Sequence, residues 1–164
     1  MDRVGLVGIY ASFSGHVSIE ECQVNGSLGL VMIIDTSDST VTGCHLRSGM
    51  YALSMADCTN VTVTLTDVSN ATIGIWLESS RGVVIDQCLL DVIGSDAILI
   101  ANGTQDCTIL NVTVISAHTA VHITGQGTMG NRVHNLSASN VQEAVNVSAA
   151  VSYTHLTLPT TPYV

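Results

Sequence analysis

A repeat of 22 to 24 residues runs through most of this 164-residue chain and constrains its fold more than any other feature. One column of apolar residues recurs in steps of 22, 22, 22, 23, 23 and 24: Ile9, Val31, Leu53, Ile75, Ile98, Val121 and Val145. A second column follows two positions later: Ala11, Ile33, Met55, Leu77, Ile100, Ile123 and Val147. Apolar positions separated by one residue have the period of a β-strand, and β-branched residues are frequent among them.

Three further apolar columns occupy the second half of each repeat. They consist of Ile19, Val41, Val63, Ile85, Ile109 and Val133; of Cys22, Cys44, Thr66, Cys88, Val112 and Leu136; and of Val24, Leu46, Val68, Leu90, Val114 and Ala138. Gly, Asn, Ser, Thr and Asp separate these short strands and favour turns. A constant unit of this length fits one coil of a parallel β-helix, in which equivalent residues stack about 4.8 Å apart.

The repeated pattern is [Gly/Ala]-Ile-x-Leu, a polar turn, then Val-x-Ile-x-x-Cys-x-Val, and it extends over residues 5–149. It resembles the right-handed parallel β-helix superfamily with the pectin-lyase-like fold. More narrowly, it is similar to carbohydrate-binding and sugar-hydrolysis repeats, including those called NosD-like. The resemblance implies an all-β, right-handed solenoid of about six coils. Lyases, hydrolases, adhesins and phage fibres share this pattern, so the fold does not select one activity.

Residues 151–164, VSYTHLTLPTTPYV, break the repeat and contain both prolines, Pro159 and Pro162. This stretch resembles the translation of a transposase-type sequencing adapter. We therefore expect residues 1–150 to be a β-helix repeat fragment and residues 151–164 to be a non-native tail. We also expect the solenoid to be truncated at both ends, so that open coils favour aggregation.

Charge excludes two classes of partner. The chain has four arginines, no lysine and a formal charge of −9, so it lacks the basic clusters that neutralise nucleic-acid phosphates or bind anionic membrane surfaces. No apolar run approaches the ~18–20 residues of a membrane span, so we expect no membrane insertion in this fragment. The first residues also lack the apolar core of a signal peptide.

Between the first two apolar columns lies a column expected to face outward. It contains Tyr10, Met32, Ser54, Trp76, Leu99, His122 and Asn146. Aromatic faces stack on sugar rings, and a row of apolar side chains on a surface is a frequent binding feature. Tyr10, Trp76 and His122 are therefore the candidates for contacting a glycan. The alternative is that a loop or a terminal segment covers this strip.

Acidic residues offer little support for catalysis. Polysaccharide lyases of the resembled superfamily hold calcium with clustered aspartates, and calcium requires several converging oxygens. Asp35 and Asp57, 22 residues apart, form the best pair, with Asp38 as a looser third member. In Gly94–Ile98, similar to part of a glycosidase pattern, Ala97 replaces the second aspartate. We expect no catalytic site and no cofactor in this fragment, with calcium at Asp35 and Asp57 as the alternative.

Cysteines and histidines are expected to be structural. Three of the five cysteines share one apolar column, and close pairs such as C-x-x-C are missing, so packing is favoured over zinc binding. The histidines fall at different points of the repeat, so no ligand set for copper is visible and we expect no metal site at them.

Seven Asn-x-[Ser/Thr] triplets indicate candidate glycosylation sites: Asn25, Asn60, Asn70, Asn102, Asn111, Asn135 and Asn146. Part of this excess follows from asparagines in turns that precede threonine-rich strands. The triplets favour an extracellular, cell-surface or periplasmic location.

The sequence thus predicts a non-catalytic β-helix scaffold or glycan-contacting module whose partner is a polysaccharide or surface glycan. One alternative is a fragment of a polysaccharide lyase or glycoside hydrolase whose catalytic coil lies elsewhere. A second is a NosD-like periplasmic accessory protein. The oligomeric state is left open.

Overall fold

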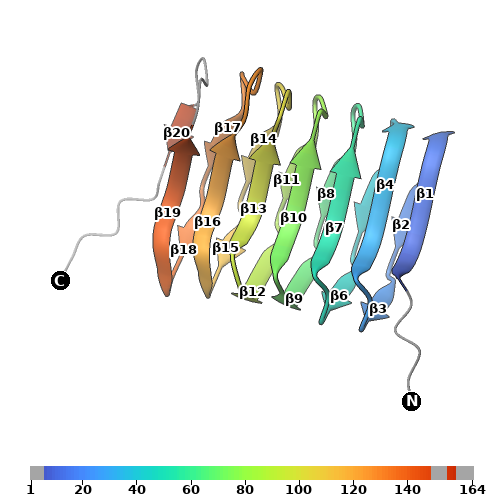
Figure 1. Ribbon diagram of the computed structural model, residues 1–164, viewed down its shortest axis with the longest axis horizontal. Helices are drawn as coiled ribbons and strands as arrows, with labels where there is room; N and C mark the ends of the chain where they lie inside the picture. Colours follow the sequence, from blue (N-terminus) through green and yellow to red (C-terminus); the bar gives the residue numbers. More distant parts are fainter. Residues whose placement is uncertain (1–5, 149–154, 158–164) are drawn as a thin grey trace.

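A computed structural model describes residues 6–148 and 155–157 and shows a solenoid built entirely from parallel strands. Successive coils stack side by side along the long axis, with the first and last described coils at opposite ends (Figure 1). The described residues contain no helix, and therefore none that could cross a membrane. The predicted all-β parallel β-helix is confirmed.

Three sheets run the length of the solenoid, and each coil contributes one strand to each sheet. Sheet A contains β1 (Val7–Gly15), β4 (Gly29–Ser37), β7 (Tyr51–Ala56), β10 (Ile73–Glu78), β13 (Asp96–Ala101), β16 (Ala117–Thr124) and β19 (Val141–Ser148). Sheet B contains β2 (Ser18–Glu20), β5 (Thr40–Thr42), β8 (Thr62–Thr64), β11 (Val84–Asp86), β14 (Thr108–Leu110), β17 (Arg132–His134) and β20 (His155–Thr157). Sheet C contains β3 (Gln23–Asn25), β6 (His45–Arg47), β9 (Asp67–Ala71), β12 (Leu89–Ile93), β15 (Thr113–Val114) and β18 (Ser137–Ala138).

The strand register reproduces the columns that the sequence predicts. In sheet A, Ile75 pairs with Leu53 on one side and with Ile98 on the other. In sheet B, Ile85 pairs with Val63 and with Ile109. Because every step of the four columns that lie within strands is a register pair, the repeat length determines which residues stack.

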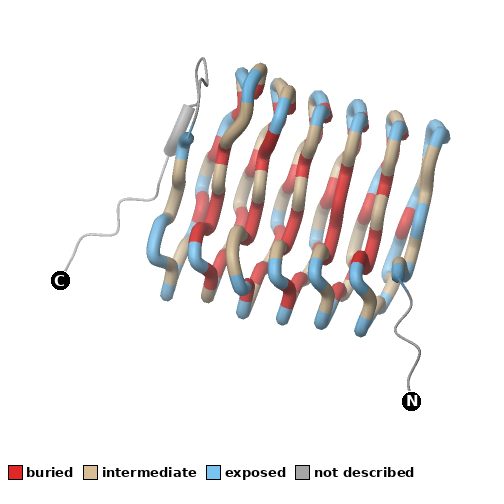
Figure 2. The backbone as a smooth tube through the Cα atoms, viewed as in Figure 1, coloured by how far each residue is buried: buried red, intermediate tan, exposed pale blue. Residues whose placement is uncertain are grey.

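The inward columns form one continuous apolar core (Figure 2). Leu53, Ile75 and Ile98 of the first column have 0% exposure, whereas Ile9 and Val145, near the two ends, are partly buried. The central coils are therefore covered on both sides by neighbouring coils, and this burial, at about 25 cal/mol per Å² of apolar surface, stabilises the solenoid.

Left-handed backbone conformations mark four corners of a typical coil. In the coil that begins with β7, they fall at Asp57, Asn60, Leu65 and Asn70, with φ between 51° and 54°. Asparagine, aspartate and glycine tolerate this conformation best, which explains why they punctuate the repeat. The corners also explain most of the Asn-x-[Ser/Thr] triplets, because five of the seven asparagines have positive φ: Asn60, Asn70, Asn102, Asn111 and Asn135.

Part of the tail joins the solenoid. The backbone of β20 (His155–Thr157) pairs in parallel with β17 and extends sheet B by one strand. The remainder of residues 151–164 lies outside the described residues. The foreign origin of this segment stays a prediction.

Candidate functional site

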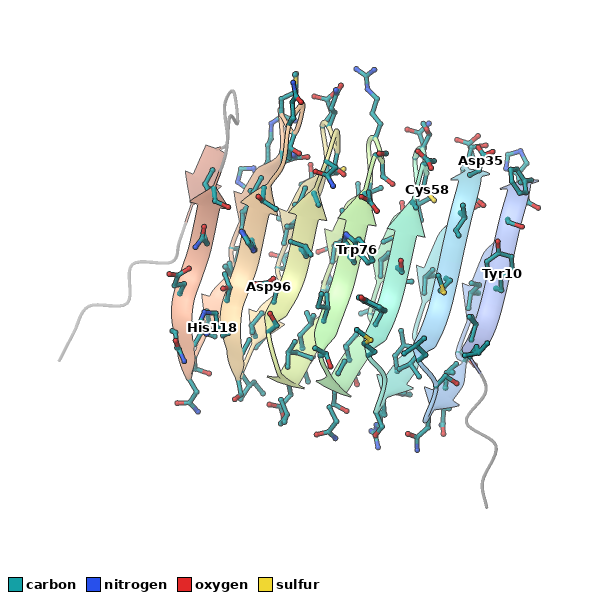
Figure 3. All side chains as sticks on the ribbon, in the orientation of Figure 1. Tyr10, Asp35, Cys58, Trp76, Asp96 and His118 are labelled. Carbon is teal, nitrogen blue, oxygen red and sulfur yellow. The ribbon has the colours of Figure 1, made fainter. Side chains whose placement is uncertain are left out.

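The outer face of sheet A carries the predicted outward column. Register pairs join Tyr10 to Met32, Trp76 to Ser54 and to Leu99, and His122 to Leu99. Figure 3 shows Tyr10 on β1 and Trp76 on β10, along this series of strands. The column predicted from the repeat is therefore continuous in space.

A local departure from strict alternation adds a second outward column to this face. Gly74 and Ile75 are consecutive in β10 and both are buried. A Cβ at Gly74 would lie 2.4 Å from the Ala97 carbonyl oxygen and 2.6 Å from Leu90 Cδ2, so only glycine fits here. Two consecutive inward residues leave the residue before them, Ile73, on the outer side with Trp76.

Tyr51 follows from the same departure, because it is the register partner of Ile73. Its ring contacts the Trp76 indole, with ring centroids 5.2 Å apart and planes inclined by 34°. Tyr51 covers part of the indole, so Trp76 is half-buried rather than fully exposed as its column suggested. The indole Nε1 is buried without a hydrogen-bond partner. Alternation alone could not reveal Tyr51, because it places that side chain inside.

Tyr10 lies apart from this aromatic pair. Its side chain is 57% exposed, and Met32 and Ser54 separate it from Trp76 in the column. Three coil spacings of ~4.8 Å place the two aromatic positions ~14 Å apart. Together, Tyr10, Met32, Tyr51 and Trp76 make an apolar strip over the first four strands of sheet A, which we call the aromatic strip.

The third predicted glycan contact, His122, lies in a polar surrounding. Its Nδ1 is 3.3 Å from Asp96 Oδ2, and its Nε2 is 2.9 Å from Ser148 Oγ. The Asp96 and His122 side chains are 13% and 25% exposed, whereas Ser148 is exposed. Sequence reasoning placed His122 on this face but found neither partner. The partners lie 26 residues away on either side, so no local motif joins them.

Asp35 and Asp57 occupy equivalent corners of neighbouring coils, with φ of 50° and 53°, and both are exposed. Figure 3 shows Asp35 at the end of its strand in sheet A, away from the middle of the face. Nowhere in residues 6–148 do three or more His, Cys, Asp or Glu side chains gather in a way that could hold a metal ion. Two exposed carboxylates alone do not supply the roughly six to eight oxygens that calcium takes, and calcium binding at Asp35 and Asp57 stays a prediction.

The corner asparagines form ladders of side-chain hydrogen bonds. Asn60 Nδ2 donates to Asp38, Asn111 Nδ2 donates to Asp86, and Asn135 Nδ2 donates to Asn111 at 2.7 Å. The two triplet asparagines without positive φ, Asn25 and Asn146, lie in β3 and β19. These ladders give the corner asparagines a structural role, and glycosylation stays a prediction.

A hollow of about 460 Å³ lies beside sheet C and is lined by Gln23, Val24, Asn25, His45 and Arg47. Next to it, His45 Nδ1 lies 3.2 Å from Asp67 Oδ2 without the alignment of a hydrogen bond. No sequence motif marks this hollow, because it depends on side chains of two neighbouring strands.

The cysteine side chains point into the solenoid or its corners. Burial raises the pKa of the Cys88 and Cys107 thiols to about 11. Burial also raises the pKa of Cys44 and Cys58 above the ordinary value. Thiols with such pKa values are poor nucleophiles at neutral pH, in agreement with the predicted packing role.

Residues 3–157 match the family described as the right handed beta helix region, and the chain belongs to this family. Among solved structures, it is similar to "a putative glycosyl hydrolase" from Parabacteroides merdae, with 8% identity and a TM-score of 0.34 over 93% of this chain and 82% of that one. Curated proteins give no significant match. The family establishes the handedness and the fold, and the function is argued from the site.

Proposed function

We propose that this protein is a surface or periplasmic β-helix module that holds a polysaccharide along the outer face of sheet A. The observation that carries the proposal is the Tyr51–Trp76 pair, in contact at 5.2 Å on that face. Paired aromatic rings present a broad apolar platform, and the apolar faces of sugar rings stack on such platforms. Parallel strands hold both rings, so binding requires little ordering.

Charge supports a neutral or weakly charged glycan. The outer column near the pair contains Met32, Ser54 and Leu99, none of which is ionisable. The formal charge of −9 opposes nucleic acids and strongly anionic polymers. An extended chain lying across several coils would meet the aromatic strip at Tyr10 as well as at Trp76.

Affinity electrophoresis against a panel of neutral polysaccharides tests this function. Trp76→Ala is expected to weaken binding about fivefold, since one aromatic contact contributes on the order of 1 kcal/mol. Phe13→Ala is the matched control, because Phe13 is an aromatic residue with 79% exposure at a corner rather than on the aromatic strip. Equal binding by the parent and Trp76→Ala would refute the proposal.

A further inference from the structure

Three side chains on adjacent strands of sheet A form a linear relay. Asp96 comes from β13, His122 from β16 and Ser148 from β19. The Asp96 carboxylate lies 3.3 Å from Nδ1, and the Ser148 hydroxyl lies 2.9 Å from Nε2 of the same imidazole. The acid therefore faces one ring nitrogen and the hydroxyl faces the other.

This order of contacts suits the tautomer of the histidine that has its ring proton on Nδ1. In that tautomer Nδ1 donates its proton to Asp96, because a carboxylate only accepts hydrogen bonds. Nε2 then has a free lone pair directed at Ser148 Oγ. A serine hydroxyl hydrogen-bonded to a basic nitrogen, which is oriented in turn by a carboxylate, is the arrangement that activates a serine nucleophile.

Exposure along the relay also suits this chemistry. Asp96, at 13%, is the most covered, His122 is at 25%, and Ser148 is exposed. The acid is thus screened from water, while the hydroxyl is open to a substrate. Strand pairing between β16 and β19 places Thr124 beside Ser148 and His122 beside Asn146, so the histidine and the serine stand on paired, rigid strands.

We infer that Ser148, His122 and Asp96 form a site that hydrolyses acyl esters. Ser148 Oγ attacks the acyl carbon while its proton passes to His122 Nε2, and Asp96 stabilises the resulting imidazolium. The bond from the acyl carbon to the alcohol oxygen breaks, and His122 returns the proton to the departing alcohol. Water, deprotonated by His122, then releases the acyl group from Ser148 as a carboxylic acid. The net reaction consumes one ester and one water and gives one acid and one alcohol.

Two further features lie next to the nucleophile. β19, which holds Ser148, is paired with β16, which holds His122. Ser148 Oγ donates a hydrogen bond to Thr124 Oγ1 at 3.1 Å, and this bond must break before His122 Nε2 can accept the serine proton.

The substrate class follows from the shared face and rests on the proposed function. Trp76 and His122 belong to one outward column with Leu99 between them, so two coil spacings place them ~10 Å apart. A sugar chain stacked on the aromatic strip would bring its next residues over Ser148. An O-acyl substituent on a bound polysaccharide is therefore the substrate class that fits.

The purified full chain, incubated with p-nitrophenyl acetate and separately with a fluorophosphonate probe, tests the ester chemistry without any glycan. The expected results are saturable ester hydrolysis and covalent labelling, with the label found on Ser148 by peptide mass spectrometry. Labelling elsewhere, or no hydrolysis above that of Ser148→Ala, overturns the inference. The position of the label does not depend on whether any variant folds.

Matched variants separate the three roles. Ser148→Ala is expected to lower kcat at least about 10³-fold, whereas Ser12→Ala, on the corresponding outer position of β1, leaves it unchanged. Asp96 is a positioning residue, so Asp96→Asn should lower kcat about 10²- to 10⁴-fold with little change in KM. An effect of Asp96→Asn on KM alone, or none, contradicts the inference.

The substrate class has its own test with acetylated and deacetylated forms of one neutral polysaccharide. Release of acetate from the acetylated form, lost in Ser148→Ala and slowed at low substrate by Trp76→Ala, supports it. Hydrolysis of p-nitrophenyl acetate that Trp76→Ala does not change, with no acetate released from the polysaccharide, would uphold the ester site and refute the glycan assignment.

Discussion

The two ends of one outer face differ in chemistry although their backbone is the same. The end built on β1 to β10 carries the aromatic strip of Tyr10, Met32, Tyr51 and Trp76. The end built on β13 to β19 carries Asp96, Thr119, His122, Asn146 and Ser148. Tyr51 contacts Trp76, and Asp96 contacts His122, with the same offset between neighbouring coils. In both pairs the second residue lies three positions beyond the register partner of the first, and we call this offset the diagonal.

The solenoid backbone therefore determines where side chains lie on this face, but not which function they perform. On each diagonal, the first residue comes just before the two consecutive inward residues of its coil. The second residue belongs to the outward column of the next coil. Aromatic side chains on the diagonal give a stacking surface, whereas an acid and an imidazole give a polar relay. The side chains alone decide which chemistry results.

The largest expected effect concerns two buried thiols in the adjacent coils where the two ends of this face meet. Cys88 lies in the coil of Trp76 and Cys107 in the coil of Asp96, and burial raises each pKa from the ordinary 9.0 to about 11. Their stabilising contribution is complete below pH 9 and is lost as pH rises through 11, at most about 3 kcal/mol for each thiol. Denaturant midpoints between pH 8 and 11 should fall steeply.

Cys88→Ala and Cys107→Ala should each remove part of this alkaline slope. If the two ends unfold as one cooperative unit, the two losses will be similar. A slope unchanged in both variants would contradict the assigned cause.

A smaller effect is expected at the diagonal itself. Gly74→Ala introduces a Cβ 2.4 Å from a backbone oxygen, which should destabilise the fold by about 1–3 kcal/mol. The equivalent position in the next coil already holds Ala97, and Ala97→Gly should cost only about 0.5–1 kcal/mol. Thermal melts followed by circular dichroism would compare the two, and equal losses would show that the close approach at Gly74 is unimportant.

A third prediction isolates the aromatic contact. The double-mutant cycle of Tyr51→Ala and Trp76→Ala should give a coupling of about 0.5–1.5 kcal/mol in unfolding free energy. Chemical denaturation of the parent, both single variants and the double variant measures this value. A cycle between Tyr10 and Trp76, which do not share a diagonal, is the control and should give a coupling near zero.

The smallest effect is expected at the corner acids of the aromatic end. Millimolar calcium should leave the melting temperature nearly unchanged, because Asp35 and Asp57 do not belong to any group of three ligand side chains in residues 6–148. A rise in melting temperature that Asp57→Asn abolishes would establish a calcium site there.

The fold could be predicted from the sequence because its signal is repeated. An apolar residue that recurs every 22 to 24 positions specifies the register of every strand, and each predicted column in sheets A, B and C is a chain of register pairs. The polar corners could be predicted as well, because Asn, Asp and Gly tolerate the left-handed backbone conformation found there.

The site was only partly predictable, because its contacts run diagonally between coils. Period-two alternation placed Trp76 and His122 outside, but strict alternation back from Leu53 and Ile98 would turn Tyr51 and Asp96 inward. Strict alternation fails here because two consecutive inward residues, such as Gly74 and Ile75, shift the preceding side chain to the outer face. The sequence signal for these paired inward residues is a small residue directly before the apolar one near the start of the strand, as in Ala52-Leu53, Gly74-Ile75 and Ala97-Ile98.

The diagonals have a consequence for how such proteins change over generations. Tandem duplication copies whole coils, and one coil can be gained or lost without disturbing the pairing of the rest. The aromatic pair needs two coils, however, and the relay from Asp96 through His122 to Ser148 needs three. The unit that duplication copies, one coil, is therefore smaller than the two or three coils that each surface requires. Gain or loss of a coil can separate the residues of either surface while the solenoid still folds.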